Sequence, residues 1–471
     1  MLIKRRTWLL VVVLALWPCT GRHLYGGAAA PAPGGERSLL LISLDGLRPD
    51  YVLKADEHGL KIPNLRRICR TGAHSTGVRG VLPTVTYASH TTIITGVWPA
   101  KHHIYSNMPF DPLGANMDGW YWYSEDIASP TIWDAACAAG IPVGSVGWPV
   151  SVGARSVQYL IPELWRTWKT EDDFKLLRAV STPGLMTEIE RKAGPYVIDS
   201  DVTTAGDLAR TRYTIEILRE KRTRLTTVHL VALDHIQHQT GPFSPQANAE
   251  LEQLDARVGE LEAAARETFP NTVICIVSDH GFARTDHSLN IMAAFVDEGL
   301  VTMAAGGTGS KTRHVVDWKA FPKVDAGSAA IILKDPNDEA TRTKVEQLLA
   351  RLAKDPANGI AQVLGPKEIA AYGGRSDAAF WVDMQTNFSV INAEGALVRT
   401  KKVGGTHGYV PSHPELLATF LIAGPGVKSG LDLGQIDMRS IAPTIVEYLG
   451  AKLPSADLRA LPVFAAGGSR K

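Results

Sequence analysis

Three aspartates stand where short apolar segments end, and histidines follow two of them. The segments SLLLISLD, TTVHLVALD and TVICIVSD end at Asp45, Asp234 and Asp279. His238 comes four residues after Asp234, and His280 directly follows Asp279. Any one of these aspartates alone could cap a helix, because Asp is favoured at helix N-termini. Together with the histidines, the three carboxylates predict a metal site.

The spacing of the other candidate ligands supports this prediction. Residues four apart, such as Asp234 and His238, lie on one face of a helical turn. His407 stands in the sequence Gly-Thr-His-Gly, where the glycines allow close backbone approach. Carboxylates and neutral imidazoles suit zinc and, less selectively, other divalent transition metals. Three aspartates and three histidines are enough for two ions, which can stabilise both the attacking and the departing oxygen of phosphoryl transfer.

Two threonines in the segment LPTVTYASH could supply a nucleophile. A hydroxyl attacks well only when its pKa is lowered, and a bound divalent ion does this. Without metals, a threonine in a loop is best explained as a turn or cap hydroxyl. That explanation fits Thr84. For Thr86, a neighbouring metal site favours nucleophilic chemistry.

The apolar segments predict an α/β fold that brings these residues together. Short runs rich in Leu, Val and Ile are typical of strands buried on both faces of a parallel sheet. Ligands of such sheets bind at the carboxyl ends of the strands. Helical patterns alternate with the strands, most clearly over 246–266, and predict helices on both faces of the sheet.

The first 30 residues have the pattern of a signal peptide. Lys4-Arg5-Arg6 is followed by an apolar run over 8–17 and small residues over 26–30. The apolar run is shorter than the roughly 20 residues that cross a bilayer. An uncleaved anchor or a lipoprotein at Cys19 are the alternatives, although bulky residues precede that cysteine. We expect a periplasmic or secreted protein, which contacts a membrane only if the signal is uncleaved.

Changes in the sequence pattern divide the remaining chain into a core, an insert and a tail. We expect the catalytic core at 36–305 and 401–455, a small α+β subdomain inserted at 306–400, and a C-terminal tail at 456–471. No candidate chemistry lies within the insert. The 49 basic and 48 acidic residues nearly cancel, so charge indicates neither a nucleic-acid surface nor a membrane surface. No pattern indicates an oligomeric state.

A series of motifs gives the chain a family resemblance. DGLRPDY, PNLRRI, PTVTYASHTTIITGVWP, HHIYSNM, DHIQHQTGP, SDHGF and GTHGY occur in this order between about 38 and 450. In order and spacing they resemble the nucleotide pyrophosphatase/phosphodiesterase family of the alkaline phosphatase superfamily. The resemblance implies a three-layer αβα sandwich with a mostly parallel central sheet. It also implies hydrolysis of phosphodiester or pyrophosphate bonds in small molecules such as nucleotides.

The resemblance assigns roles to individual residues. It implies a covalent phosphothreonine on Thr86, a donor from the Asn107 amide to a phosphate oxygen, and a base-stacking wall at Tyr87. Packing is the alternative role for Tyr87. It implies one zinc ion held by Asp45, Thr86, Asp279 and His280, and a second held by Asp234, His238 and His407.

Departures from the family pattern leave other substrates open. Tyr87-Ala88 follows the nucleophile where the family usually has Phe-Pro, and Leu82 stands where an aromatic residue is common. A phosphate monoesterase or a phosphonate hydrolase of the superfamily are the alternatives. Similar monoesterases carry a Lys-Asp-Arg stretch where this chain has WPVSVG at 148–153, so the clamp for a dianion is missing.

Two further classes are disfavoured, and six histidines are set aside. A sulfatase needs a Cys-x-Pro-x-Arg motif, which the chain lacks. A binding protein on a degenerate phosphatase fold would lack a ligand or the nucleophile, and none is missing. We expect hydrogen-bonding, packing or surface roles for His90, His102, His103, His235, His287 and His413.

Overall fold

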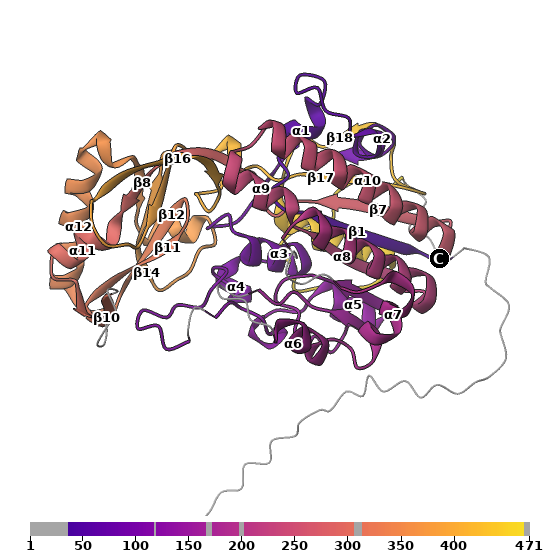
Figure 1. Ribbon diagram of the computed structural model, residues 1–471, viewed down its shortest axis with the longest axis horizontal. Coiled ribbons are helices and arrows are strands. Elements are labelled where there is room, and N and C mark those ends of the chain that lie inside the picture. The colour runs from indigo at the N-terminus through magenta and orange to yellow at the C-terminus, as the bar shows by residue number, and fades with distance from the viewer. Residues whose placement is uncertain (1–35, 117–118, 166–171, 197–201, 306–312, 466–471) are drawn as a thin grey trace, which may run out of the picture. The chain divides into compact units, whose positions relative to one another are not determined.

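The aspartate-bearing segments run side by side in one large, mostly parallel sheet (Figure 1). The computed structural model describes residues 36–116, 119–165, 172–196, 202–305 and 313–465. The strand order is β18-β2-β17-β7-β1-β6-β4-β5, in which β7 to β5 are parallel and β17 is antiparallel to β7. The strands are β1 Ser38–Leu44, β2 Ala73–His74, β4 Val143–Val146, β5 Tyr159–Ile161, β6 Leu225–Leu230, β7 Thr272–Val277, β17 Phe420–Ala423 and β18 Leu431–Asp432.

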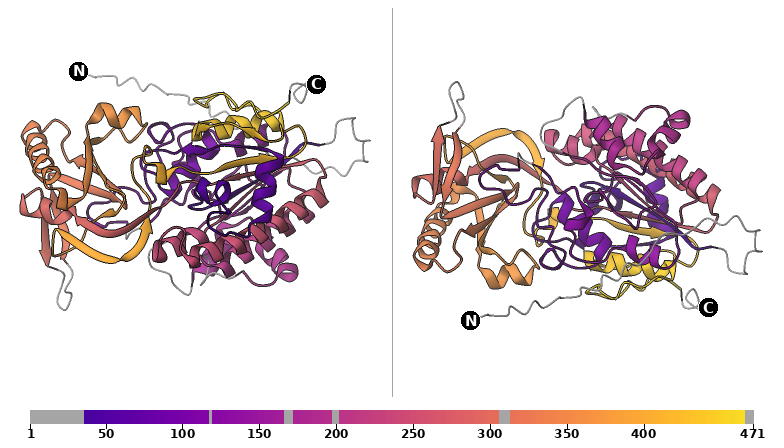
Figure 2. Two further views of the ribbon diagram at one scale, coloured as in Figure 1. Left: turned by 90° about the horizontal axis from the view of Figure 1, so that it is seen from above. Right: turned by 90° about the horizontal axis from the view of Figure 1, so that it is seen from below.

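Helices cover both faces of this sheet, as predicted. Leu40 and Ile42 of β1 belong to one hydrophobic cluster, and Leu39 and Leu41 belong to another. The mainly apolar sequence of β1 therefore reflects burial on both faces. Figure 2 shows the sheet between two helical layers. One layer contains α1 Pro49–Leu53, α2 Pro63–Thr71, α6 Asp173–Val180, α7 Leu185–Ala193, α8 Thr204–Glu216, α9 Ala232–Thr240 and α10 Pro245–Thr268, and the other contains α3 Thr86–Thr95, α5 Ile132–Ala138 and α14 Ile441–Leu449.

The strand that leads to Asp234 ends earlier than its apolar sequence predicts. β6 ends four residues before Asp234, which lies in the first turn of α9. The buried Asp207 carboxylate accepts hydrogen bonds from the backbone N–H groups of Val231 and Ala232 at 3.0 and 2.9 Å. These bonds satisfy the donors at the helix start, so the chain turns into α9 here. The strand assignment of this last segment is wrong, whereas the helical turn that joins Asp234 to His238 is confirmed.

A second group of strands forms sheets of its own and includes the predicted insert (Figure 1). One sheet has the order β11-β12-β14-β13 and another β15-β8-β16. A separate hydrophobic cluster contains Phe295, Ile331 and Val382. Because β8 and β9 precede residue 306, the cluster extends beyond the expected insert, whose boundaries stay a prediction. The elements are β8 Ala283–Asn290, α11 Ile291–Asp297, β9 Val301–Ala305, β10 Arg313–Trp318, β11 Ala320–Asp325, β12 Ser328–Leu333, α12 Glu339–Lys354, β13 Ile360–Leu364, α13 Pro366–Ala371, β14 Ala378–Met384, β15 Phe388–Ile391 and β16 Val398–Thr406.

The expected signal peptide and the expected C-terminal tail lie at the two ends of the chain. The expected signal peptide, residues 1–30, lies outside the described residues. Of the expected tail, residues 456–465 are described, and they pack on the core: Val463 is buried, and Phe464 stacks on Tyr448 with ring centroids 5.4 Å apart. Within the described ranges, no helix combines the length and the apolar character needed to cross a bilayer.

Candidate metal centre and nucleophile

The three aspartates converge at the carboxyl ends of neighbouring strands. Asp45 directly follows β1, Asp279 comes two residues after β7, and Asp234 projects from α9. Asp45 and Asp279 are buried, and the Asp234 side chain is 18% exposed. The backbone N–H of Gly46 donates to Asp279 Oδ1 at 3.2 Å, which joins the ends of the two strands. The crevice expected at this sheet edge is therefore lined by carboxylates.

The three predicted histidines turn the same ring nitrogen toward these carboxylates. In each ring, Nδ1 lies 2.9–3.1 Å from a backbone carbonyl oxygen, which can only accept. Nδ1 therefore carries the proton, and Nε2 keeps a free lone pair, as in metal-bound histidines. His280 Nε2 lies 3.1 Å from Asp279 Oδ2, and His238 Nε2 lies 3.4 Å from Asp234 Oδ2. His407 Nε2 lies 3.8 Å from Asp234 Oδ1.

The charges and unpaired atoms of this cluster fit divalent metal ions. Among the described residues, Asp45 Oδ1, Asp234 Oδ1 and Asp279 Oδ2 are buried without a hydrogen-bond partner. Burial raises the pKa of Asp45 well above its usual range, and the charges of Asp279 and Asp234 raise it further. Burial lowers the pKa of His280 to about 3 and that of His238 to about 4, so both imidazoles are neutral. A cation between these groups would satisfy the carboxylates and accept the imidazole lone pairs.

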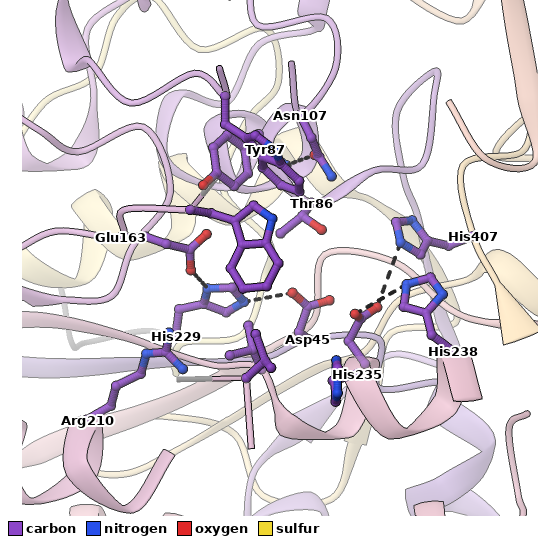
Figure 3. Close-up of a pocket in the computed structure, with 15 residues that line it drawn as sticks. Asp45, Thr86, Tyr87, Asn107, Glu163, Arg210, His229, His235, His238 and His407 are labelled. Atoms are coloured by element: carbon purple, nitrogen blue, oxygen red, sulfur yellow. Dashed lines mark hydrogen bonds and ion pairs between the residues drawn. The ribbon is translucent and has the colours of Figure 1, made fainter. Parts of the chain in front are cut away.

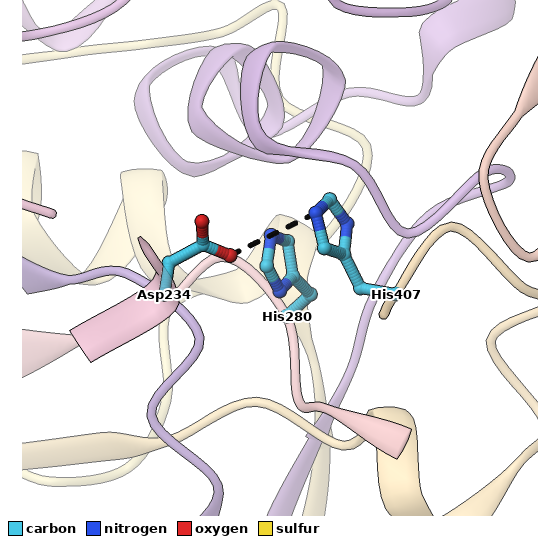
Figure 4. Close-up of side chains that lie close together, drawn as sticks. All are labelled: Asp234, His280 and His407. Carbon is cyan, nitrogen blue, oxygen red and sulfur yellow. Dashed lines mark ion pairs between the residues drawn. The ribbon is translucent and has the colours of Figure 1, made fainter. Parts of the chain in front are cut away.

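The predicted ligands form two overlapping groups. Donor atoms of Asp45, Asp279 and His280 lie within 4.8 Å of one another, and so do donor atoms of Asp234, His280 and His407. His280 belongs to both groups, and its ring stacks on that of His407 with centroids 3.7 Å apart and an interplanar angle of 8° (Figure 4). The structure thus brings the predicted ligands together, with His238 adjacent to Asp234. Their division between two ions stays a prediction.

Thr86 is the first residue of α3 and lies beside this cluster. Val85 before it is extended, with φ −122°, so the helix begins where the chain reaches the site. Thr86 Oγ1 lies 3.5 Å from His280 Nε2, and the residue is 9% exposed. The start of a helix offers backbone N–H groups and the positive end of the helix dipole, which attract phosphate. Thr86 is therefore placed where an anionic substrate and a metal could meet.

Thr84 and His90, which we did not predict to bind metal, hydrogen-bond to residues of the site. The Thr84 carbonyl accepts the His407 Nδ1–H at 2.9 Å, and Thr84 Oγ1 donates to a backbone carbonyl at 3.0 Å. His90 Nδ1 donates to the Thr86 carbonyl at 2.8 Å, and its Nε2 lies 2.8 Å from Ser43 Oγ. Both residues are buried. The structural role expected for Thr84 and the hydrogen-bonding role expected for His90 are confirmed.

The Asn107 amide is oriented by the backbone of α3. The backbone N–H of Tyr87 donates to Asn107 Oδ1 at 2.9 Å. Because an N–H needs an acceptor, this bond assigns the oxygen and makes the NH₂ group the donor end of the side chain. Figure 3 shows Asn107 beside Thr86 at the cavity. Asn107 and Thr86 therefore line the same cavity.

A cavity of about 200 Å³ opens beside Thr86 (Figure 3). Tyr87 lines it and packs edge-to-face on Trp120, with centroids 5.2 Å apart. Trp120 and Trp165 are not among the predicted site residues, although the aromatic run WYWY at 120–123 was an available signal for an aromatic wall. The residues that line the cavity are Asp45, Thr86, Tyr87, Asn107, Trp120, Glu163, Trp165, Val202, Arg210, His229, Val231, Asp234, His235, His238 and His407.

A buried histidine that sequence reasoning missed holds Asp45. His229 of β6 lies 2.9 Å through Nε2 from Asp45 Oδ2 and 2.9 Å through Nδ1 from Glu163 Oε2. Burial by itself lowers the pKa of His229, but the charge of Glu163 and the hydrogen bond to Asp45 raise it to about 10. The available signal was an ionisable histidine inside a strand of Leu, Val and Thr. Since His229 engages Oδ2, the free Oδ1 of Asp45 faces the metal groups.

We expect His229→Phe to weaken zinc binding about 10- to 100-fold, the range for groups that orient metal ligands. The substitution frees Asp45 to rotate and leaves the buried Glu163 without its partner. Competition with a chelator of known affinity measures the change. His287→Phe, a half-buried histidine paired with Asp286, is the matched control and should bind zinc as the wild type does. Equal affinities for both variants would contradict a role of His229 in holding Asp45.

Comparison with known proteins decides the family. The family model described as type I phosphodiesterase / nucleotide pyrophosphatase matches residues 39–410. The chain belongs to this family. A venom phosphodiesterase from Naja atra is 24% identical over 443 residues, which cover 90% of the chain and 46% of the relative. Ectonucleotide pyrophosphatase/phosphodiesterase family member 3 of Rattus norvegicus is 24% identical over 257 residues, covering 52% of the chain and 25% of the relative.

Solved structures of the family share the fold. Murine ectonucleotide pyrophosphatase/phosphodiesterase 5 superposes with a TM-score of 0.61 at 20% identity, covering 91% of this chain and 98% of that one. An inactive variant of the same mouse protein in complex with AMP gives the same TM-score at 19% identity, covering 92% and 98%. The predicted α/β architecture of the chain is thereby confirmed. The chain spans less than half the length of the curated relatives named above.

Proposed function

We propose that this phosphodiesterase-family protein hydrolyses phosphodiester and pyrophosphate bonds of small molecules, nucleotides among them, through a covalent phosphothreonine on Thr86. The observation that carries the proposal is the position of the Thr86 hydroxyl, 3.5 Å from His280 Nε2 at the start of α3 and beside converging carboxylates and imidazoles. The AMP complex of the related mouse protein supports a nucleotide substrate.

Two zinc ions would lower the pKa of the Thr86 hydroxyl and neutralise phosphate charge if held by the predicted ligand sets. Thr86 Oγ forms a bond to phosphorus as the bond to the leaving oxygen breaks. The Asn107 NH₂ group donates to a non-bridging oxygen, where negative charge develops. Water then cleaves the phosphothreonine and restores the Thr86 hydroxyl.

The cavity favours a monoanionic diester over a dianionic monoester. Arg210 is the one arginine or lysine among the described residues that line it, and it pairs with the buried Asp207 at 3.0 Å. The stretch 148–153 lacks a cation, and Trp148 and Val150 within it are buried. A second phosphate charge would therefore lack a dedicated clamp. The aromatic wall formed by Tyr87 and Trp120 suits a flat base or another apolar group on the substrate.

Relative turnover of two chromogenic substrates tests this proposal. We expect the zinc-loaded protein to hydrolyse bis-p-nitrophenyl phosphate with a kcat/KM at least about 10-fold above that for p-nitrophenyl phosphate, because the lost clamp is a charge-assisted contact of roughly 1.5–3 kcal/mol. The reverse ranking would instead support a phosphate monoesterase. A panel of dinucleotides, sugar nucleotides and lysophospholipid diesters would then identify the preferred leaving group.

The proposal includes a location outside the cytoplasm, periplasmic or secreted. The support is the signal-peptide pattern of residues 1–30 together with the occurrence of relatives in venoms. Expression of the full chain in a bacterial host, followed by N-terminal sequencing of the periplasmic fraction, would test it. Protein retained in the cytoplasm with its N-terminus intact would contradict it.

A further inference from the structure

A buried lysine of the second group of strands contacts the residue before Asn107. Lys323 on β11 is 8% exposed, and its Nζ donates to Ser106 Oγ at 3.0 Å. The Ser106 hydroxyl donates to the Asp325 carboxylate and accepts the Met108 backbone N–H at 3.4 Å. A hydroxyl has one donor and two acceptor positions, and all three are used here. The turn that carries Asn107 is therefore fixed to β11.

The end of β11 also contacts the loop that carries His407. The Asp325 carbonyl oxygen would lie 1.9 Å from a Cβ at Gly408, so this contact requires glycine. Ser328, at the start of β12, donates through Oγ to the Gly408 carbonyl at 2.5 Å. One turn between two strands thus touches the neighbour of Asn107 on one side and the neighbour of His407 on the other.

Two hydrogen bonds hold Asn107 itself, in addition to the contacts between Ser106 and β11. The Asn107 side chain is held by the Tyr87 N–H at 2.9 Å, and its backbone carbonyl accepts the Tyr121 N–H at 3.0 Å. The Tyr87 contact links the amide to the His407 loop, because Thr84, three residues earlier, accepts the His407 Nδ1–H and the Gly408 N–H. The bonds of Ser106 to β11 form a second, separate link to the same loop. A buried lysine and aspartate cost free energy unless they are paired and hydrogen-bonded, and Ser106 joins them.

We propose that Lys323 and Asp325 are positioning residues of the active site, which hold Ser106 so that the Asn107 amide faces a phosphate oxygen beside His407. The inference rests on the proposed function and gives a catalytic role to a segment in which the sequence shows no candidate chemistry. Reactions that depend on donors placed in advance lose about 10²-fold in rate for a displacement near 1 Å.

A double-mutant cycle between Ser106 and Asn107 tests the proposal. We expect Ser106→Ala to lower kcat for bis-p-nitrophenyl phosphate about 10- to 100-fold with zinc content unchanged. The melting temperature should fall by a few degrees, because the buried Lys323 and Asp325 lose the hydroxyl that joins them. In an Asn107→Ala background, the same change should cost less than about 2-fold, because its effect passes through the amide. Lys323→Met should match Ser106→Ala, and Lys323→Arg should restore part of the loss. Lys334→Met, an exposed lysine of the same group of strands, is the matched control and should leave kcat unchanged.

A binding measurement separates failure of this inference from failure of the proposed function. Calorimetric titration of the zinc-loaded protein with inorganic phosphate should show about 10-fold weaker binding for Ser106→Ala only when Asn107 is present. If phosphate binding follows this pattern across the variants but the wild type cleaves no diester, the proposed function is overturned and the inference stands. Losses that are equally large with and without Asn107, in rate or in phosphate affinity, overturn the inference.

Discussion

Thr86→Ala is expected to lower kcat by at least about 10⁴-fold, which corresponds to roughly 5 kcal/mol of transition-state stabilisation. The substitution removes the one hydroxyl that starts α3 beside His280, at 3.5 Å from Nε2. It removes little buried volume, and the carboxylates and imidazoles of the metal groups stay in place. Zinc content by elemental analysis should therefore be that of the wild type, with a melting temperature within a few degrees.

The control for this experiment lies on the same helix. Thr95, at the end of α3, is also buried and donates to the Thr91 carbonyl at 2.7 Å, away from the metal groups. Thr95→Ala should keep kcat within about 2-fold, whereas Thr86→Ser should retain measurable turnover because it keeps a hydroxyl. Turnover by Thr86→Ala at the wild-type rate would remove Thr86 from the mechanism, and loss of bound zinc would instead make it mainly a ligand.

Removal of bound metal is expected to abolish turnover and to lower the melting temperature together. Asp45, Asp234 and Asp279 converge with buried oxygens that have no hydrogen-bond partner among the described residues. Without cations, their mutual repulsion and desolvation oppose folding. Ligand held at 1,000 times its Kd stabilises the folded state by about 4.1 kcal/mol. We therefore expect a loss of several degrees after chelation, with kcat falling at least about 10³-fold.

Restoration with defined metals completes this experiment. Zinc should restore both rate and melting temperature at two ions per chain, whereas magnesium should restore neither, since it prefers oxygen ligands over imidazole. The His238→Ala variant should bind fewer zinc ions than the wild type, because His238 Nε2 lies 3.4 Å from Asp234 Oδ2. Full activity in the chelated protein would contradict a metal-dependent mechanism.

Local sequence was enough to predict the position of a residue where that position depends only on the strand or helix that carries it. β1 and β7 end beside Asp45 and Asp279 because runs of Leu, Val and Ile form strands buried on both faces, and parallel strands end at one edge. The spacing of Asp234 and His238 similarly fixes their place on one helical face. Sequence patterning failed at the start of α9, since the end of β6 depends on Asp207, a distant carboxylate that holds two backbone donors.

The partners of these residues were decided only by tertiary structure. His229 is the one ionisable residue of β6, and its function follows from two carboxylates that reach it from other strands and loops. Lys323 lies more than 200 positions from Ser106, yet their side chains hydrogen-bond. Motif spacing reports which groups can bind a metal or attack phosphorus. Which side chains hold those groups in place depends on packing between distant segments, and the pattern of neighbouring residues carries no record of that packing.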